Sequence, residues 1–250
     1  MSTKISLYTS GRTGSQFVYE LLKANLNGLE LVEWLSPSFK RTDDSITNKK
    51  FLAYLCDRML RNPDDFAIKI TPHMFQDFWD DARDQIEEVL CATKATKQIL
   101  MYRDDFWGLC VSDWIANKTG KWHSNQAPQE GRDVSFEKVA RSMFRSESLI
   151  FDCFLDHAST NAMIISYESL LSSPVTFSHS LLRKITSTNP SFSSFRAKSL
   201  TKRVLQPETE GYLDLIQSIP EAELDLFYDL KDARDKALVS RLSKFYAIAN

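Results

Sequence analysis

A short segment near the N-terminus combines residue types that bind anions. The segment Ser10–Ser15 reads Ser-Gly-Arg-Thr-Gly-Ser and separates an expected strand, 4–9, from an expected helix, 17–26. Its two glycines allow a tight turn that brings backbone N–H groups close to an anion, and the start of the helix adds partial positive charge. Arg12 adds a formal charge. The segment predicts an anion site or, alternatively, a serine-capped turn; it lacks the Walker A pattern Gly-x-x-x-x-Gly-Lys-Ser/Thr.

An arginine and a serine later in the chain suit a second phosphate. Arg103 follows an expected strand, 98–102, and Ser112 lies within the helix expected over 104–118. The planar guanidinium and a hydroxyl are good phosphate donors, and helical geometry can turn both towards one point. The alternative is that Arg103 pairs with Asp104 or Asp105 and that Ser112 is an incidental helix residue.

Short strand-like segments alternate with helical ones along the chain. Strands are expected at 4–9, 29–33, 66–70, 98–102 and 162–166, and helices at 17–26, 51–60, 72–90, 104–118 and 136–157. This alternation predicts an α/β fold, in which a parallel sheet connected by right-handed crossovers is flanked by helices. We expect a single domain over 1–250, with a helical C-terminal extension over about 190–250.

The expected sheet predicts where these side chains meet. Ligands of open parallel sheets bind outside the carboxyl ends of the strands. The residues that follow the expected strands are the segment Ser10–Ser15, Glu33, the stretch from Lys69 to His73, Arg103 and Tyr167. We therefore expect them to converge on one edge of the sheet.

The overall composition excludes several classes of protein. The 250 residues carry 31 basic and 33 acidic side chains, so the chain has no general attraction to nucleic acid. No stretch approaches the roughly 18–20 apolar residues that span a bilayer, and the first residues read as a strand rather than a signal peptide. The four cysteines lie far apart, which favours reduced thiols in a cytoplasmic protein over a zinc or redox site.

Several short segments occur in a fixed order along the chain: Ser10–Ser15, Glu30, Glu33-Trp34, Lys69, Arg103 with Ser112, Thr119–His123 and Tyr167-Glu168-Ser169-Leu170. Taken in this order, they resemble the bacterial sulfotransferases of the trehalose sulfotransferase type. The resemblance covers roughly Ile5–Thr186, with a weaker similarity near Lys198–Gln206. Gln16 departs from it, because similar loops usually continue Gly-Ser-Thr.

The resemblance implies a P-loop-like, nucleotide-kinase-like fold and 3′-phosphoadenosine 5′-phosphosulfate (PAPS) as donor, with no metal. Arg103 and Ser112 would hold the 3′-phosphate, and Tyr167 would lie near the adenine. Lys202 and Arg203 belong to an acid-free stretch that would close over the 3′-phosphate or, alternatively, form a solvated helix face. The residues implied for the 5′-phosphosulfate are Arg12, Thr13, Gly14, Ser15 and Gln16.

Sulfuryl transfer places charge on oxygens, so positioning and cationic donors should supply most of the catalysis. Arg12 is the candidate on the leaving-group side, and Lys69 is a candidate assistant. The acceptor hydroxyl needs a base within hydrogen-bond distance. Glu33 is the first choice because it ends a strand at the expected edge. Glu30 is the near alternative, His73 is a competing base, and Glu33 is alternatively a surface acid or an arginine partner.

The expected acceptor is the hydroxyl of a carbohydrate, either a small molecule or a glycolipid. Trp122 and His123 lie in a polar loop and are candidates for stacking on a sugar, with Glu30 nearby in the binding role; Trp122 alternatively packs into the core. A homodimer is left open. The competing functions are an ATP-dependent kinase and a non-catalytic nucleotide-binding protein.

Overall fold

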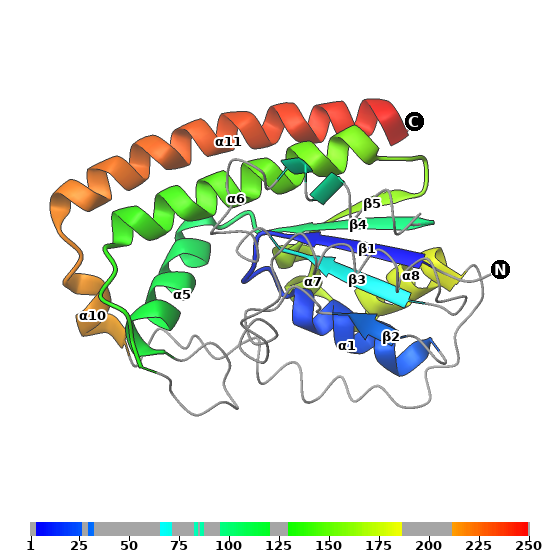
Figure 1. Ribbon diagram of the computed structural model, residues 1–250, viewed down its shortest axis with the longest axis horizontal. Coiled ribbons are helices and arrows are strands. Elements are labelled where there is room, and N and C mark those ends of the chain that lie inside the picture. The colour runs from blue at the N-terminus through cyan, green and yellow to red at the C-terminus, as the bar shows by residue number, and fades with distance from the viewer. Residues whose placement is uncertain are drawn as a thin grey trace, which may run out of the picture.

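The computed structural model describes residues 4–26, 30–32, 66–71, 83–84, 86–87, 96–120, 130–186 and 212–249. Five parallel strands form one sheet in the order β2-β3-β1-β4-β5 (Figure 1). This confirms the expected α/β fold with a parallel sheet. The strands are β1 (Lys4–Thr9), β2 (Glu30–Val32), β3 (Phe66–Ile70), β4 (Lys97–Tyr102) and β5 (Ala162–Ser166).

Helices cover both faces of the sheet. In Figure 1, α1, α7 and α8 lie on one face, α6 and α11 lie on the other, and α5 and α10 lie past the carboxyl ends of the strands. The described helices are α1 (Ser15–Asn25), α5 (Phe106–Thr119), α6 (Phe136–His157), α7 (Tyr167–Ser172), α8 (Pro174–Thr186), α10 (Leu213–Gln217) and α11 (Glu221–Ala249).

Side chains of the central strand alternate between two apolar layers. Leu7 of β1 packs in the layer under α1 and α8, whereas Tyr8 packs on the opposite face against α6. Both are buried, as is usual for a parallel sheet covered on both faces. Tyr8 contacts Phe154 of α6 edge to face, with ring centroids 5.3 Å apart.

The strand order creates a switch point at the carboxyl edge. The connection from β1 leads towards β2 and β3, and the connection from β4 leads the other way, to β5. Strands β1 and β4 are neighbours, with Thr9 opposite Met101. Ligands of open α/β sheets bind at such points. The order also differs from the 3-2-1-4-5-6 and 2-1-3-4-5 orders of other doubly wound sheets.

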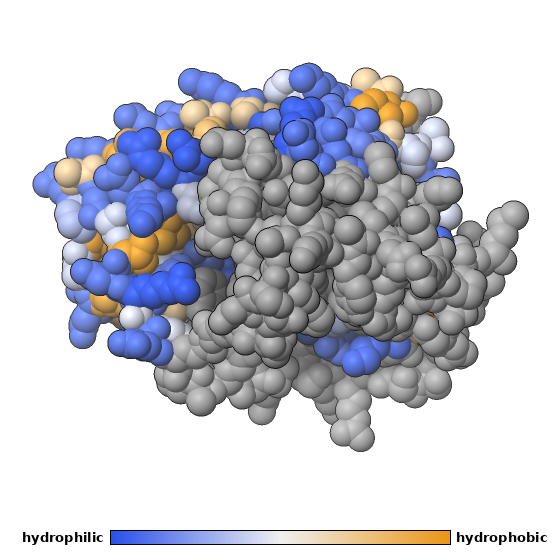
Figure 2. Space-filling model, viewed as in Figure 1, coloured by the Kyte–Doolittle hydropathy of each residue, from blue (hydrophilic) through white to orange (hydrophobic). Residues whose placement is uncertain are grey.

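The outer helix α11 forms the last layer. Its surface in Figure 2 is mostly hydrophilic with scattered apolar residues. Among the described helices, none combines the length and apolar character needed to cross a membrane.

Two of the four cysteines, Cys110 and Cys153, lie in the described residues, and both are buried free thiols.

Most expected boundaries hold within one or two residues wherever the structure describes them. The first helix begins at Ser15 rather than at 17, and the fourth strand begins at Lys97. The expected helix 51–60, most of 72–90 and the first part of the C-terminal extension lie outside the described residues. From 212 onwards that extension is helical, as expected.

A third apolar cluster joins α5 to α6 and α11, and its stability can be tested at Phe227. This ring lies on α11, is 1% exposed, and stacks on Phe106 at 5.5 Å and contacts Phe136 at 5.6 Å. We expect Phe227→Ala to lower the free energy of unfolding by about 3–5 kcal/mol, because it leaves a cavity in this cluster. Urea denaturation followed by circular dichroism measures the loss.

The neighbouring residue supplies the control. Tyr228 is 59% exposed, so Tyr228→Ala should cost less than about 1 kcal/mol. Equal losses in the two variants would contradict the packing described for α11.

Candidate functional site

The loop after β1 has an unusual backbone conformation. Gly11, Arg12 and Gly14 have φ values of 91°, 50° and 73°. Within the described part of the chain, Arg12 is the one non-glycine residue with positive φ. This conformation is costly for residues with a Cβ and is concentrated at ligand sites. Successive N–H groups in such turns form an anion-binding concavity in front of the helix N-terminus.

Hydroxyl groups hold this loop from inside. Thr9 and Thr13 are fully buried, and their Oγ1 atoms are 2.5 Å apart. The Gly11 N–H donates to Thr9 Oγ1 at 3.1 Å. Ser15 is buried where α1 begins. Thr13, predicted as a donor to the ligand, thus uses its hydroxyl to hold the loop.

Arg12 joins the loop to α5. Its Nε donates to Ser112 Oγ at 2.9 Å, and its Nη2 donates to the Ser112 carbonyl oxygen at 3.2 Å. Ser112 was predicted to meet Arg103; the structure places it against Arg12 instead. The reason is the switch point, which sets the loop after β1 beside the helix that follows β4. Ser112 is therefore not an incidental helix residue.

Arg103 lies beside Tyr167, as the sheet register requires. Tyr102 and Ser166 are partners across β4 and β5. Arg103 and Tyr167 directly follow these two residues, so they leave the ends of neighbouring strands side by side. The Arg103 guanidinium carbon lies 4.9 Å from the centre of the Tyr167 ring. A Cβ added to Gly14 would lie 2.9 Å from Tyr167 Cδ2, so the ring packs directly on the loop. Tyr167 thus links the loop to Arg103.

Two carboxylates accompany Arg103. Its Nη2 donates to Asp105 Oδ2 at 3.1 Å, and its Nε lies 4.0 Å from Glu168 Oε1. The alternative pairing with Asp105 is therefore observed. Asp105 also caps α5, accepting from the Gly108 N–H at 2.9 Å. A Cβ on Gly108 would lie 2.1 Å from Asp105 Oδ2 and 2.2 Å from Arg103 Nη2, so the pair occupies the space that a side chain there would need.

Three buried polar atoms at this edge make no hydrogen bond within the described structure. They are Ser10 Oγ in the loop, Thr71 Oγ1 after β3 and Arg103 Nε after β4. Buried polar groups are normally satisfied, and an exception needs an explanation such as a ligand. An anion at the switch point would supply hydrogen-bond acceptors for Ser10 and Arg103, which follow the two neighbouring strands β1 and β4.

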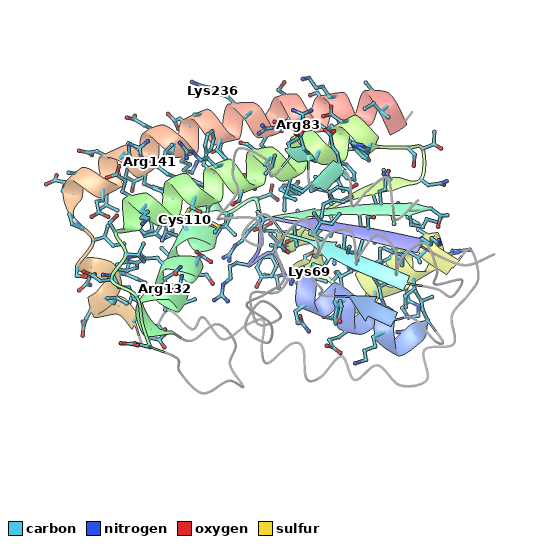
Figure 3. All side chains as sticks on the ribbon, in the orientation of Figure 1. Lys69, Arg83, Cys110, Arg132, Arg141 and Lys236 are labelled. Atoms are coloured by element: carbon cyan, nitrogen blue, oxygen red, sulfur yellow. The ribbon has the colours of Figure 1, made fainter. Side chains whose placement is uncertain are left out.

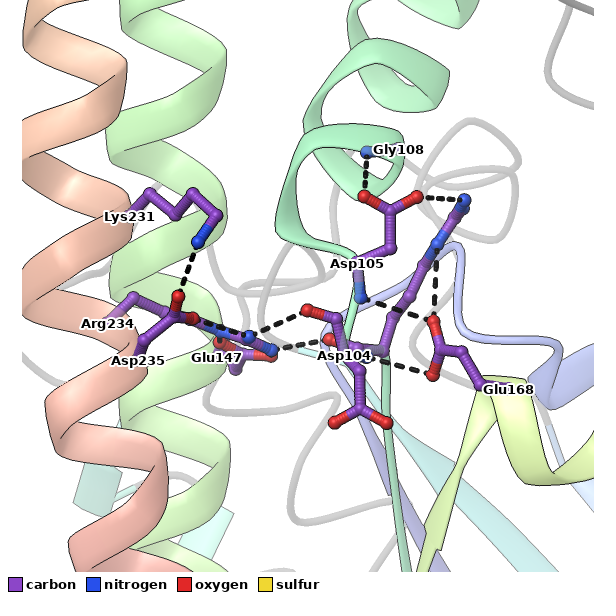
Figure 4. Close-up of polar contacts among 9 residues, drawn as sticks. Asp104, Asp105, Gly108, Glu147, Glu168, Lys231, Arg234 and Asp235 are labelled. Carbon is purple, nitrogen blue, oxygen red and sulfur yellow. Dashed lines mark hydrogen bonds and ion pairs between the residues drawn. The ribbon is translucent and has the colours of Figure 1, made fainter.

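The backbone that carries Arg103 is held from two sides (Figure 4). Arg234 of α11 donates to the carbonyl oxygens of Arg103 and Asp104, the latter at 3.0 Å, and forms a two-point ion pair with Glu147 of α6 at 2.7 and 2.8 Å. Glu168 of α7 accepts from the N–H groups of Asp104 and Asp105 at 2.9 and 3.2 Å. We call this segment, residues 103–105 with Arg234 and Glu168, the β4–α5 junction.

Sequence reasoning missed Arg234 and Glu147. A signal was present, because Arg234 occupies an otherwise apolar stripe of α11 at helical spacing, between Leu230 and Leu238. Such a position is buried, and Arg234 is 2% exposed. A buried arginine requires a carboxylate or carbonyl partner.

Two further predicted residues, Lys69 and Gln16, are described by the structure. Lys69 is the last but one residue of β3, half-buried and opposite Leu7 (Figure 3). Gln16 is exposed, and its amide donates along α1 to Glu20 at 2.9 Å.

The other predicted residues lie at the amino end of β2 or outside the described residues. Glu30 opens β2 and thus lies at the amino end of that strand, whereas Glu33 directly follows its carboxyl end, Val32. The amino end of β2 is the end away from the carboxyl edge of the sheet, which argues against Glu30 at the switch point. Outside the described residues lie Glu33, His73, Trp122, His123, Lys202 and Arg203.

No known family model matches the chain, and no curated protein matches it. Within the described residues, no group of three or more His, Cys, Asp or Glu side chains is arranged to hold a metal ion.

A buried carboxyl group next to Ser112 gives a pH prediction. Asp113 is 9% exposed; burial raises its pKa from the ordinary 3.8 to about 6, although Arg12 and the Asn117 amide both lower it. The folded state holds the proton more tightly, so the neutral carboxyl contributes stability below about pH 4 that is lost as pH rises through about 6.

We therefore expect Asp113→Asn to stabilise the fold at pH 7.5, by on the order of 2 kcal/mol, and to have little effect near pH 4. The amide keeps an acceptor for Asn117 without a buried charge. Urea unfolding of both proteins at the two pH values measures the difference. A variant that is less stable than the wild type at pH 7.5 would overturn the assignment.

Proposed function

We propose that the protein transfers a sulfuryl group from PAPS to a hydroxyl of a carbohydrate or glycolipid. One observation carries the proposal: the loop after β1 contacts α5 through Arg12 and Ser112, and contacts Arg103 through Tyr167. Four of the described residues that resemble the donor-binding residues of trehalose-type sulfotransferases, Arg12, Arg103, Ser112 and Tyr167, therefore belong to one connected group at the switch point.

Two separate cationic centres suit a donor that carries phosphate on both the 3′ and the 5′ oxygen of its ribose. Arg12 lies in the loop, with its guanidinium on α5, and Arg103 lies after β4 beside Tyr167. The loop would receive the 5′-phosphosulfate, and Arg103 the 3′-phosphate. The buried atoms Ser10 Oγ and Arg103 Nε fit this assignment, since neither makes a hydrogen bond within the described structure.

The proposed reaction moves one group and one proton. The acceptor oxygen forms a bond to sulfur while the bond between sulfur and the 5′-phosphate oxygen breaks. The hydroxyl proton passes to Glu33, with Glu30 and His73 as the other candidates, and 3′-phosphoadenosine 5′-phosphate (PAP) leaves. Arg12 would stabilise charge on the leaving oxygens, with Lys69 assisting, since preorganised cations supply most of such catalysis.

We place the protein in the cytoplasm, acting without a metal, with Trp122 and His123 on the acceptor and with Lys202 and Arg203 over the 3′-phosphate.

Nucleotide preference tests the donor assignment. PAP at about 100 times its dissociation constant should stabilise the fold by roughly 2.7 kcal/mol, which raises Tm by roughly 5–10 °C for a chain of this size. ADP and ATP should give smaller shifts. Arg103→Ala should weaken PAP binding by about 10- to 100-fold, because it removes a charged hydrogen-bond donor to the 3′-phosphate.

An exposed arginine on α6 supplies the control: Arg145→Ala removes the same charge and should leave PAP binding unchanged. Equal binding of PAP, ADP and ATP by the wild type would exclude the proposed donor. It would favour the kinase or the non-catalytic alternative.

The base is tested by turnover. We expect Glu33→Gln to lower sulfate transfer from labelled PAPS to trehalose, used as the probe acceptor, by at least about 100-fold. PAP affinity should stay unchanged, because the carboxylate acts on the acceptor proton and not on the nucleotide. An active Glu33→Gln variant beside an inactive His73→Ala variant would assign the role to His73.

A further inference from the structure

We propose that Arg234 is a positioning residue for the donor site: it sets the backbone from which Arg103 reaches the 3′-phosphate. The inference rests on the proposed function. It extends the site to α11, whose residues were predicted only as a helical extension.

Besides the carboxylates of Glu147 and Asp235, Arg234 binds two main-chain carbonyl groups. Its Nη1 donates to the Asp104 carbonyl oxygen at 3.0 Å, and its Nη2 donates to the Arg103 carbonyl oxygen. Both carbonyls lie beyond Tyr102, the last residue of β4. They are thus past the end of the strand, and the guanidinium supplies the hydrogen-bond donors that a neighbouring strand would supply within the sheet. Figure 4 shows the guanidinium between α6 and this segment.

Glu168 completes the arrangement from the other side. It accepts from the N–H groups of Asp104 and Asp105 at 2.9 and 3.2 Å. Two side chains of opposite charge therefore bind two carbonyls and two N–H groups of three consecutive residues. The peptide planes of the β4–α5 junction are fixed, and with them the direction in which the Arg103 side chain leaves the backbone.

Burial makes this arrangement specific. Arg234 and Glu147 are 2% and 3% exposed. Burial lowers the pKa of Arg234, but the hydrogen bonds and charges of Glu147 and Asp235 together outweigh it, so the pKa is raised overall. A buried ion pair seldom stabilises a fold more than apolar packing of the same volume does. The two carbonyl contacts give Arg234 a second role that apolar packing would not fill.

The same two helices offer a matched control. Arg241 of α11 pairs with Asp152 of α6 through Nε and Nη2, at 2.9 and 3.2 Å. Like Arg234, it forms a two-point ion pair across the α6–α11 interface. Its described contacts are with Asp152 and with the ring of Phe151, and none of these involves residues 103–105. Arg241→Lys therefore perturbs the helix pair without touching the β4–α5 junction.

The experiment compares Arg234→Lys with Arg241→Lys. Lysine keeps the charge but lacks the planar fork that serves a carboxylate and two carbonyls together. Affinities for PAP and ADP are measured by calorimetry at a temperature where circular dichroism shows each variant folded. We expect Arg234→Lys to reduce the PAP-over-ADP preference by about tenfold or more, because the contact of Arg103 with the 3′-phosphate is misplaced. Arg241→Lys should keep the wild-type preference.

A double variant tests whether Arg234 acts through Arg103. If it does, Arg103→Ala combined with Arg234→Lys should lose no more preference than Arg103→Ala alone. Should Arg234→Lys not fold, Glu147→Gln takes its place, since it loosens the guanidinium while keeping an acceptor and the shape of the side chain.

The outcomes separate the two proposals. No PAP preference in the wild type overturns the proposed function and this inference with it. A wild-type preference that survives in folded Arg234→Lys or Glu147→Gln overturns the positioning role alone. So does an equal loss in Arg241→Lys, or a further loss in the double variant.

Discussion

Two oppositely charged side chains hold the peptide groups at which β4 gives way to α5, and the geometry of the candidate site depends on them. Arg234 binds the carbonyls of this junction and Glu168 binds its N–H groups. Arg103 departs from the same backbone, and α5, which begins there, carries Ser112 to Arg12. The junction thus positions both cationic centres, and each of the three helices α6, α7 and α11 contributes to it.

The loop after β1 forms the other half of the candidate site, and its neighbours hold it in an unusual backbone conformation. Positive φ at Arg12 is a strain that the surrounding contacts must balance. The Thr9–Thr13 hydrogen bond within the loop and the hydrogen bonds of Arg12 to Ser112 of α5 offset that strain. Tyr167 packs over Gly14 and leaves no room for a side chain there. Contacts within the protein alone therefore hold the turn in its strained conformation.

The fold was largely predictable from the sequence because alternating strand and helix patterns allow few topologies. The predicted edge was correct for the Ser10–Ser15 loop, Arg103 and Tyr167, since each follows a strand directly. Long-range partners were not predictable. Nothing local distinguishes a Ser112 that meets Arg12 from one that meets Arg103, because the strand order decides it. Arg234 was missed for the same reason: its helical stripe indicated burial, but its carbonyl partners lie 130 residues or more away in sequence.

Gly108 shows how far the requirements of a site extend into an ordinary helix. Glycine is among the poorest helix formers, costing about 1 kcal/mol relative to alanine in a helix interior. Here it stands in the first turn of α5, where any Cβ would overlap the Arg103–Asp105 pair. A residue of low helix propensity at this position leaves the space in which Arg103 and Asp105 form their ion pair. A side chain at residue 108 would first displace the ends of Asp105 and Arg103, so a substitution there disturbs this ion pair while leaving both charges in the sequence.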